Sequence, residues 1–363
     1  TEGYKAAKAR FLKETNRDMT VKEFRSLASM YLSSIQDGHT VLYWGERKYL
    51  EVDWTSIDGK LVLLDEDKQV TDKVVAKING VAIEQVLDTI KELFPAENEV
   101  AESENYAIYS KVETVLINAG IDCSNAMKLT IISEAGKEEI KTEFVYAEKE
   151  RIIDYEISNK KLDDKTIYVK FGVCQMNEDL NKVAESLKKA VDEGIEKVII
   201  DVRNNPGGDS RACVLLLEAL QIKPGHFGAV IRFSPLAQQT YGYLRKSGYI
   251  TYEGSNDVIK NENIDLYVII NEQTFSSAQW LATWVKDGNL GTIVGRPSSN
   301  MPSSFGDVLQ FQLPNSKLEG QISYKKWTRP DKTRDRERML EPDIYVNYSQ
   351  DPLDVIAESG RSK

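Results

Sequence analysis

Two adjacent serines, Ser276 and Ser277, follow the apolar segment "IDLYVII" at the point where a helical pattern begins. A serine beyond the end of a buried strand can act as a nucleophile, because free backbone amides at the start of a helix stabilise an oxyanion. It can equally be a helix N-cap that accepts an N2 or N3 amide bond. The glycines of the G-x-S-x-G nucleophile elbow are missing, so this segment alone favours the cap. If Ser276 is the nucleophile, the Ser277 amide is a natural oxyanion donor.

A serine nucleophile needs a base, and the chain has two histidines, His39 and His226. His226 lies between glycines in "KPGHFG", which is typical of a solvated surface loop. His39 follows a helix-breaking Asp-Gly and precedes the apolar "TVLYW", which would hold it on a firm backbone. Each histidine alone is more typical of a structural residue than of a base.

A glycine turn in "VIIDVRNNPGGDS" could supply further amides. The strand ends at Arg203, and the chain turns through Gly207 and Gly208 into a helix. The loop lacks both G-x-x-x-x-G-K-[ST] and G-x-G-x-x-G, so phosphate binding is disfavoured. A plain turn remains an alternative. The functional interpretation is that Gly207 or Gly208 lets a bare amide approach a substrate carbonyl.

Length and charge limit the classes of function. A chain of 363 residues is longer than a single hydrophobic core usually supports, which predicts two or three domains. The net charge of -10 disfavours nucleic acid, and no apolar run is long enough to span a membrane. Three cysteines fit no metal or redox spacing. The opening "TEGYKAAKARF" shows no secretory signal and no starting Met, which suggests a mature or trimmed chain and leaves the compartment open.

Periodicity predicts the elements that must position these residues. The chain to about residue 36 is helical, with one face formed by Val21, Phe24, Leu27, Ala28 and Tyr31. Residues 50 to 150 show short alternating runs, including strand, turn and helix in "KINGVAIEQVL", which predict a small α+β module. Beyond residue 160 strands alternate with helices, which indicates a largely parallel sheet covered on both faces.

The C-terminal third contains three more predicted features. The helix that starts near Ser276 places Ala278, Leu281, Ala282 and Val285 on one face and ends at Gly288. A hairpin is predicted for "DVLQFQLPNSKLEGQISYKKW", and a short helix for "PLDVIAESG". "RPDKTRDRER", residues 329–338, favours a solvated loop, although an arginine there could bind a peptide carboxylate.

Four segments carry a resemblance to a known family: "DGHT", "VIIDVRNNPGG", "VIINEQTFSSAQWLATWVKDGNLGTIVG" and "EPDIYV". They resemble, in order and spacing, the C-terminal processing peptidases, or tail-specific proteases, a superfamily that includes the tricorn core protease. "KINGVAIEQVL" resembles the PDZ-like module of that family. The resemblance implies a helical N-terminal segment (1–49), a PDZ-like module (50–150) and a crotonase/ClpP-like α/β catalytic core (151–363).

The family's functional residues fall on defined positions of this chain. The resemblance places the nucleophile on Ser276 and the oxyanion donors on Gly207, Gly208 and the Ser277 amide. One branch of the family uses a lysine as base, but the matching position is Met301, and residues 287–316 contain no lysine. The resemblance to that branch therefore fails at the base.

The tricorn-like branch instead uses a histidine that a glutamate orients, and those positions match His39 and Glu341. A carboxylate on one imidazole nitrogen fixes the tautomer while the other nitrogen takes the serine proton. By itself, Glu341 in "MLEPDIYV" is typical of a surface carboxylate. The tricorn-like tetrad also has a serine before its histidine, where this chain has Gly38. The fourth member of the tetrad is therefore unassigned.

The residues and the resemblance together predict a serine endopeptidase without a metal or organic cofactor, acting on peptides or unfolded chains. The alternative is a non-catalytic ligand- or peptide-binding protein on the same fold, as retinoid-binding relatives illustrate. A scaffold that works through the PDZ-like module is a third possibility. By resemblance we expect an extracytoplasmic location, and the oligomeric state is open.

Overall fold

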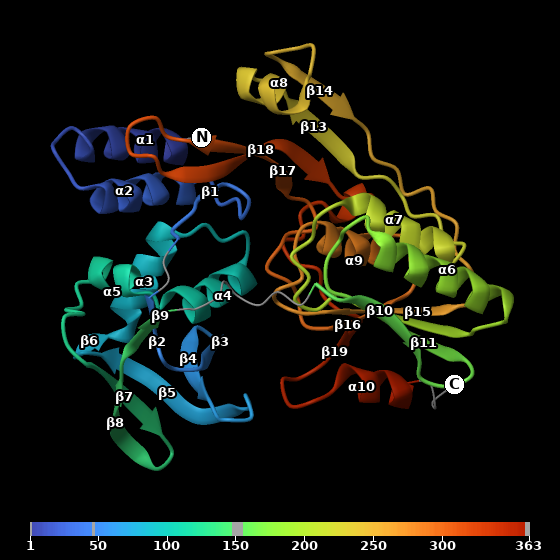
Figure 1. Cartoon of the computed structure of the whole chain (residues 1–363), viewed down its shortest axis with the longest axis horizontal. Helices are drawn as coiled ribbons and strands as arrows, with labels where there is room; N and C mark the ends of the chain where they lie inside the picture. Colours follow the sequence, from blue (N-terminus) through green and yellow to red (C-terminus); the bar gives the residue numbers. More distant parts are fainter. Residues whose placement is uncertain (1, 46–47, 147–154, 360–363) are drawn as a thin grey trace. The chain divides into compact units, whose positions relative to one another are not determined.

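The computed structural model describes residues 2–45, 48–146 and 155–359 and consists of two compact units (Figure 1). The first comprises Thr1–Ile152 with Asp307–Ser323, and the second Ile153–Gly306 with Tyr324–Lys363. The predicted helical segment and α+β module both fall in the first unit. The boundary predicted at residue 150 lies outside the described residues. In the described part of the chain, no helix is long and apolar enough to cross a membrane.

The first unit begins with two helices, α1 (Glu2–Glu14) and α2 (Val21–Ser33). Thr20 caps α2 in a capping box with Glu23, so the start of this helix is encoded locally. Phe24 and Tyr31 pack against Phe11 of α1, with ring centroids 6.0 and 5.2 Å apart. The prediction that the chain is helical to about residue 36 is confirmed by these two helices.

The buried side of α2 differs from the predicted apolar face. Val21 is 51% exposed, whereas Arg25, Ser26 and Ser29 are buried. Arg25 donates to the Trp44 carbonyl at 2.7 Å, and the Trp44 indole donates to Ser29 Oγ at 3.0 Å. Trp44 thus supplies a hydrogen-bond partner to both Arg25 and Ser29 inside the fold. A periodicity argument that counts only apolar residues does not identify this buried side.

The α+β module of the first unit is an antiparallel sheet with three helices. Its strand order is β3-β4-β5-β7-β8, with β6 beside β5. The predicted "NG" turn joins β5 to β6, and both residues have positive φ, 47° at Asn79 and 82° at Gly80. Its elements are β3 (Trp54–Ile57), β4 (Lys60–Leu64), β5 (Val70–Ile78), β6 (Val81–Ala82), α3 (Ile83–Leu93), α4 (Glu99–Tyr109), α5 (Glu113–Asn118), β7 (Met127–Ser133) and β8 (Gly136–Thr142).

Shorter strands complete the first unit. β2 (Lys48–Leu50) pairs with β9 (Phe144–Tyr146), and β1 (Val41–Leu42) pairs with the first part of β18 (Glu319–Thr328). β17 (Phe305–Gln312) pairs with β18, which confirms the predicted hairpin. Both strands of this hairpin are shared between the two units.

The second unit is built on a six-stranded sheet in the order β10-β11-β12-β15-β16-β19. β10 is antiparallel to β11, and every other neighbouring pair is parallel, as predicted. Its strands are β10 (Ile157–Lys161), β11 (Thr166–Phe171), β12 (Lys197–Asp201), β15 (Asp265–Ile270), β16 (Thr292–Gly295) and β19 (Ile344–Tyr345). The apolar runs of β12 and β15 are buried on both faces, which explains their continuous hydrophobic character.

Helices cover both faces of this sheet (Figure 1). On one side, the core under Val198, Ile200 and Val268 is formed with α6 (Glu178–Asp192), α7 (Ser210–Ala219) and α9 (Ser277–Asp287). On the other side, Ile199 packs with Ile356 of α10 (Pro352–Ser359). Alternate residues of one strand therefore face different layers. α9, the predicted helix after the serine pair, ends at Gly288 as expected.

The second unit also contains an arm and a short turn. β13 (Gly228–Arg232) pairs with the second part of β18 and with β14 (Tyr249–Tyr252), and α8 (Pro235–Tyr241) lies between β13 and β14 in the chain. A 3-10 turn, η1 (Lys332–Arg334), follows β18.

Candidate active site

Ser276 occupies a strained backbone position between β15 and α9. Its φ of 53° and ψ of -122° lie in a region that residues with a Cβ rarely adopt, at a cost of about 1–3 kcal/mol. Although Ser276 is the N-cap residue of α9 by position, its side chain makes no capping hydrogen bond. The helix-cap interpretation is therefore wrong. No described residue bonds to the Oγ atom, so this half-buried hydroxyl is uncommitted.

Three hydrogen bonds hold the backbone around Ser276. Its amide donates to Asn300 Oδ1 at 2.7 Å, and its carbonyl accepts from the Trp280 amide at 3.0 Å. The preceding Phe275 amide donates to the Asn205 carbonyl at 2.9 Å. Asn300 is fully buried, so its acceptor oxygen is fixed in place. These bonds compensate for the backbone strain and position the hydroxyl.

Gly207 supplies the missing glycine of the elbow from a different part of the chain. A Cβ built on Gly207 would lie 2.6 Å from Ser276 Cβ and 2.8 Å from the Ser277 amide nitrogen. Its φ of +92° also favours glycine. The space in front of the Ser277 amide, where an oxyanion would bind, is therefore open because residue 207 has no side chain.

Two of the three predicted oxyanion donors, the Gly208 and Ser277 amides, have no hydrogen-bond partner among the described residues. The Gly207 amide instead donates to Asn205 Oδ1 at 2.8 Å. The Ser277 hydroxyl donates to the Gly208 carbonyl at 2.7 Å and so ties the two donor segments together. The Gly208 and Ser277 amides are therefore available to an acceptor, whereas the Gly207 amide is already bonded. The oxyanion role of these residues stays a prediction.

Asparagines and a cysteine that sequence reasoning missed hold the glycine turn. The Asn204 amide donates to Asn271 Oδ1 at 2.9 Å, and Asn271 Nδ2 donates back to Asn204 Oδ1 at 2.8 Å. Asn205 Nδ2 donates to the Phe171 carbonyl at 2.6 Å. The Cys174 amide donates to the Gly207 carbonyl at 3.0 Å. The "NN" before the glycines was the available signal, because asparagine side chains commonly stabilise turns.

His39 lies in the first unit, in a tight turn before β1. Its amide donates to Asp37 Oδ1 at 3.0 Å, and the Thr40 amide donates to the Asp37 carbonyl at 3.0 Å. The Gly38 amide donates to Glu97 Oε1 at 3.1 Å. Asp37 and Glu97 are both buried. Two carboxylates that sequence reasoning did not assign therefore hold the backbone beside His39.

The surroundings of His39 favour its neutral form. Burial lowers the pKa of His39 from its ordinary value, and the charges of Asp37 and Asp307 partly oppose this shift. The Nδ1 atom lies 3.8 Å from Asp37 Oδ1. Because a general base must be deprotonated before it acts, a lowered pKa keeps His39 competent at and below neutral pH.

Two residues of this turn and Glu97, which lies between α3 and α4, form a group that could hold a metal ion. One ligand atom from each of Asp37, His39 and Glu97 lies within 4.8 Å of the others. One imidazole nitrogen and two carboxylates are a donor set that suits zinc. A metal on the imidazole would occupy a nitrogen that acid–base chemistry needs, so this donor set and a catalytic His39 compete. The expectation of a cofactor-free enzyme stays a prediction.

Glu341 belongs to the second unit, is exposed, and has no hydrogen bond or ion pair with any described residue. The chain around it is fixed, because Leu340 is fully buried. The Asp343 carboxylate also pairs with Lys286 and accepts from the Ile293 amide at 2.8 Å. The segment that carries Glu341 is therefore held in place, while the Glu341 carboxylate has no partner among the described residues.

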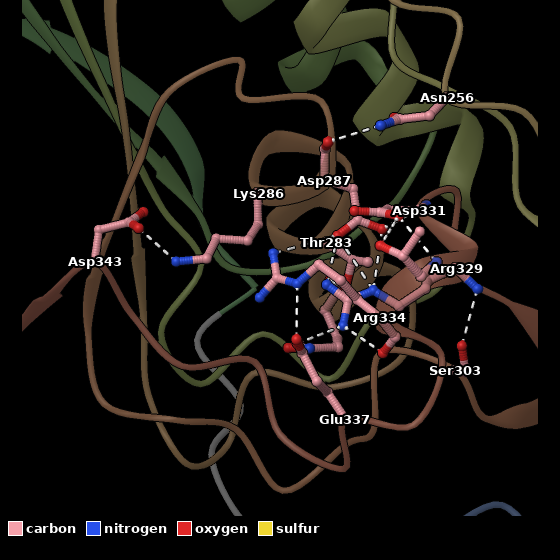
Figure 2. A network of polar contacts seen from close by, with 12 residues as sticks. Asn256, Thr283, Lys286, Asp287, Ser303, Arg329, Asp331, Arg334, Glu337 and Asp343 are labelled. Carbon is pink, nitrogen blue, oxygen red and sulfur yellow. Dashed lines mark hydrogen bonds and ion pairs between the residues drawn. The ribbon is translucent and has the colours of Figure 1, made fainter.

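A buried ion-pair network lies at the other end of α9 (Figure 2). Arg329 is fully buried, and its guanidinium binds the buried carboxylate of Asp287 through both the Nε and one terminal nitrogen. Glu337 accepts from Arg329 at 2.9 Å and from Arg334 at 2.8 Å. The prediction of a solvated loop over 329–338 is therefore wrong for Arg329. Charges of both signs are buried here because they neutralise one another.

This network also reaches the loop that carries Asn300. The Arg329 amide donates to Ser303 Oγ at 2.9 Å, and the Trp327 amide donates to the Ser304 carbonyl at 2.8 Å. Asp287 ends the helix that begins after Ser276. The network thus anchors the C-terminal end of α9 together with the loop whose asparagine holds the amide of Ser276.

The structure brings the serine pair and the glycine turn together in the second unit, as expected from strand ends at one edge of a parallel sheet. That unit also contains Glu341, whereas His39 belongs to the first. The pairing of His39 with Ser276 and Glu341 stays a prediction.

Solved structures share this fold. The crystal structure of mature CPAF matches with a TM-score of 0.65 and 14% identity, over 94% of this chain and 86% of that chain. Mature CPAF complexed with lactacystin matches with a TM-score of 0.64 and 14% identity, over 94% and 87% of the two chains. At this identity the likeness concerns the fold, and it confirms the predicted α/β class.

Sequence comparison gives the family. Peptidase family S41 matches residues 165–346, half of the chain, and the chain belongs to this family. A probable CtpA-like serine protease of Staphylococcus aureus (strain bovine RF122 / ET3-1) is 25% identical over 205 residues. The alignment covers 53% of this chain and 38% of that protein, so it spans little more than a third of the relative. The predicted resemblance to C-terminal processing peptidases is thus confirmed. The matched region includes Ser276 and Glu341, but not His39.

Proposed function

We propose that the chain is a serine endopeptidase in which Ser276 attacks the scissile carbonyl. The observation that carries this proposal is the strained Ser276 turn beside Gly207, where a hydroxyl and two nearby amides have no partner among the residues that the structure describes. A structural serine would not require backbone strain, a buried asparagine acceptor and a bare glycine at one point. Strain of this kind is characteristic of active sites.

The proposed reaction uses five groups. His39 takes the Ser276 proton as its oxygen bonds to the carbonyl carbon, and the Gly208 and Ser277 amides stabilise the resulting oxyanion. His39 then donates that proton to the leaving amine as the peptide bond breaks. Water, activated by His39, hydrolyses the acyl-enzyme and regenerates the serine. Glu341 orients the imidazole and stabilises its cationic form.

The magnitudes explain why each part is needed. General base catalysis supplies about 100- to 10,000-fold, and one oxyanion donor about 100- to 1,000-fold. The lowered pKa of His39 supports its role as the base, since the neutral imidazole persists at neutral pH. The assignment requires His39 to come within hydrogen-bond reach of Ser276 in the working enzyme. We propose peptides or unfolded protein chains as substrates, in keeping with the peptidase family.

Labelling with a fluorophosphonate tests the nucleophile and the base together. We expect modification of Ser276 in the native protein, no labelling of Ser276→Ala, and at least about 100-fold slower labelling of His39→Ala. His226→Ala is the matched control, because it removes the other histidine from an exposed position. Its labelling rate should equal that of the parent.

The same experiment separates the enzyme from the alternative class. Folded protein that remains unlabelled, with no turnover of casein-like unfolded substrates, would favour a non-catalytic binding protein on this fold. If Ser276 is labelled at the same rate in His39→Ala as in the parent, Ser276 remains the proposed nucleophile, but His39 is excluded as its base.

A further inference from the structure

Two cysteines outside the proposed catalytic set lie directly beside the oxyanion site. Cys174 follows β11, and Cys213 lies in α7, yet their Sγ atoms are 3.5 Å apart. Both residues are buried, with 2% and 0% exposure. The proposed mechanism uses neither thiol. Their spacing in sequence fits no redox motif, and only the fold brings them together.

Each thiol contacts one side of the proposed oxyanion site. The Cys213 thiol lies 3.3 Å from the Ser277 carbonyl oxygen, to which it can donate. The Cys174 thiol lies 3.6 Å from Asn205 Oδ1, the same oxygen that accepts from the Gly207 amide. The thiol pair therefore spans the gap between the two segments that carry the candidate oxyanion donors.

The backbone of Cys174 is bonded to the glycine turn as well. Its amide donates to the Gly207 carbonyl at 3.0 Å, and its carbonyl accepts from the Asp209 amide at 2.7 Å. A Cβ built on Gly208 would lie 2.3 Å from the Cys174 carbonyl oxygen, so the two chains are in tight contact. These two hydrogen bonds and the close contact couple the backbone of Cys174 to Gly208, so a backbone displacement of Cys174 would move Gly208.

We propose that Cys174 and Cys213 form a reversible disulfide that switches the oxyanion site between two geometries. This inference rests on the proposed peptidase function for its effect on activity, but not for the formation of the bond. A disulfide requires sulfur atoms about 2.05 Å apart, so the pair must close by roughly 1.5 Å from the observed separation of 3.5 Å. That movement is transmitted to the Gly208 amide through Cys174.

The chemistry needs an external oxidant, for which a glutathione-type disulfide is sufficient. One cysteine thiolate attacks the oxidant and releases one reduced glutathione, which forms a mixed disulfide. The second thiolate attacks that mixed disulfide and releases the second glutathione. The two thiols of the protein lose two protons and two electrons in total, and the oxidant becomes two thiols.

Burial determines how the switch responds to reagents. Burial and the neighbouring Cys174 raise the pKa of the Cys213 thiol well above its ordinary value. The folded reduced pair is therefore slow to react with bulky alkylating agents, which attack thiolates. Oxidation is expected during folding or transient opening, before the pair is sealed from solvent. Oxidation and reduction of the folded protein should therefore both proceed through such openings, and more slowly than at an exposed pair.

The third cysteine provides a matched control. Cys123 belongs to the first unit, whereas the pair belongs to the second. It is partly buried, and burial raises its pKa to about 11. Cys123→Ala should leave pair formation unchanged, whereas Cys174→Ala and Cys213→Ala should each abolish it.

Refolding the full chain from denaturant in reduced or in oxidised glutathione tests the proposal. Thiols are then counted in denaturant after acid quenching, and the linked peptides are identified by mass spectrometry. We expect three thiols after reduction and one after oxidation, with Cys174 joined to Cys213. Three thiols under oxidising conditions, or a different pairing, would overturn the disulfide.

Activity on an unfolded peptide substrate gives the second readout. The oxidised protein should show kcat lowered about ten-fold or more with little change in KM, since donor geometry matters most in the transition state. Dithiothreitol should restore the rate of the parent but have no effect on Cys213→Ala. A disulfide that forms without changing kcat would overturn the switch. If the Cys174–Cys213 disulfide forms under oxidising conditions but the reduced protein has no activity, the result would instead count against the proposed peptidase function.

Discussion

Gly207 and Ser276 are 69 positions apart in the sequence by number, yet a single methyl group on Gly207 would meet Ser276 Cβ at 2.6 Å. The same methyl group would lie 2.8 Å from the Ser277 amide nitrogen and would fill the space where an oxyanion is expected. The glycine thus has a steric function, while its own amide is engaged with Asn205. Close backbone approach is the reason that a side chain is excluded here.

Gly207→Ala should therefore lower kcat by about 100- to 1,000-fold, comparable with the loss of an oxyanion donor. It should also destabilise the fold by about 1–3 kcal/mol, because alanine at a φ of +92° is strained. Gly194→Ala is the matched control: it has a φ of +79° but nothing within 4 Å of an added Cβ. We expect the control to lose stability in thermal melts and to keep its activity. Equal kcat losses in both variants would contradict the steric role.

The pH profile should report the buried state of His39. Its pKa is lowered by burial, so the acid limb of kcat/KM should have its inflection below the ordinary histidine value of about 6.5. The folded protein then binds fewer protons than the unfolded chain as pH falls below about 6.5, so stability decreases toward acid pH. This stability is present above the unfolded pKa and is lost as pH falls through the folded pKa.

Rates measured from pH 4.5 to 8, with urea unfolding at the same pH values, check both statements. His39→Ala should show a flatter dependence of unfolding free energy on pH across the histidine range. An acid inflection well above 6.5 would show that a neighbouring carboxylate, and not burial, dominates the pKa of the base.

Two carboxylates could serve His39, and their variants should behave differently. Glu341 is exposed and uncommitted, so Glu341→Gln should keep the melting temperature and lower kcat by about 100- to 10,000-fold through loss of the orienting charge. Asp37 accepts the His39 amide and the Thr40 hydroxyl, so Asp37→Asn should lower both stability and activity. If Glu341→Gln retains full kcat, the orienting role passes to Asp37.

Asn300 should matter for catalysis although it contacts only the backbone of the nucleophile. Asn300→Ala removes the acceptor of the Ser276 amide and should lower kcat about 10- to 100-fold, with about 1–3 kcal/mol of lost stability. Asn300→Asp retains an oxygen at that place and should recover most of kcat. Comparing kcat, KM and melting temperature for the two variants tests this. A full loss of kcat in Asn300→Asp would show that the amide group has another essential role.

The sequence predicted those features that depend on local pattern. Apolar runs and turn residues located the strand before Ser276, the helix after it and its end at Gly288, because periodicity and capping act within a few residues. The glycine turn was found for the same reason. Four spaced motifs then identified the family, which composition alone could not do.

The features that were missed depend on contacts between distant segments. The Ser276 amide is held by Asn300, 24 positions away, and Arg329 is buried by Asp287, 42 positions away. A mixed-charge segment is usually solvated, and no local pattern shows that one of its arginines pairs with a buried carboxylate from a distant helix. Asp37 looked like a helix breaker, because its role comes from side-chain bonds within a folded turn.

Arg329 offers the sharpest test of that buried network (Figure 2). Arg329→Met leaves the Asp287 carboxylate buried and short of its main partner, so unfolding in urea should show a loss of about 3–5 kcal/mol. Arg329→Met combined with Asp287→Leu removes both charges and should recover at least half of that loss, since an apolar pair can replace a buried ion pair. Lys332→Met, which removes a cation from an exposed pair with Glu253, should change stability by less than about 1 kcal/mol. A double variant no more stable than Arg329→Met would mean that the other bonds of these two side chains, of Arg329 to Glu337 and of Asp287 to the Asp331 amide, stabilise the fold more than their mutual pairing does.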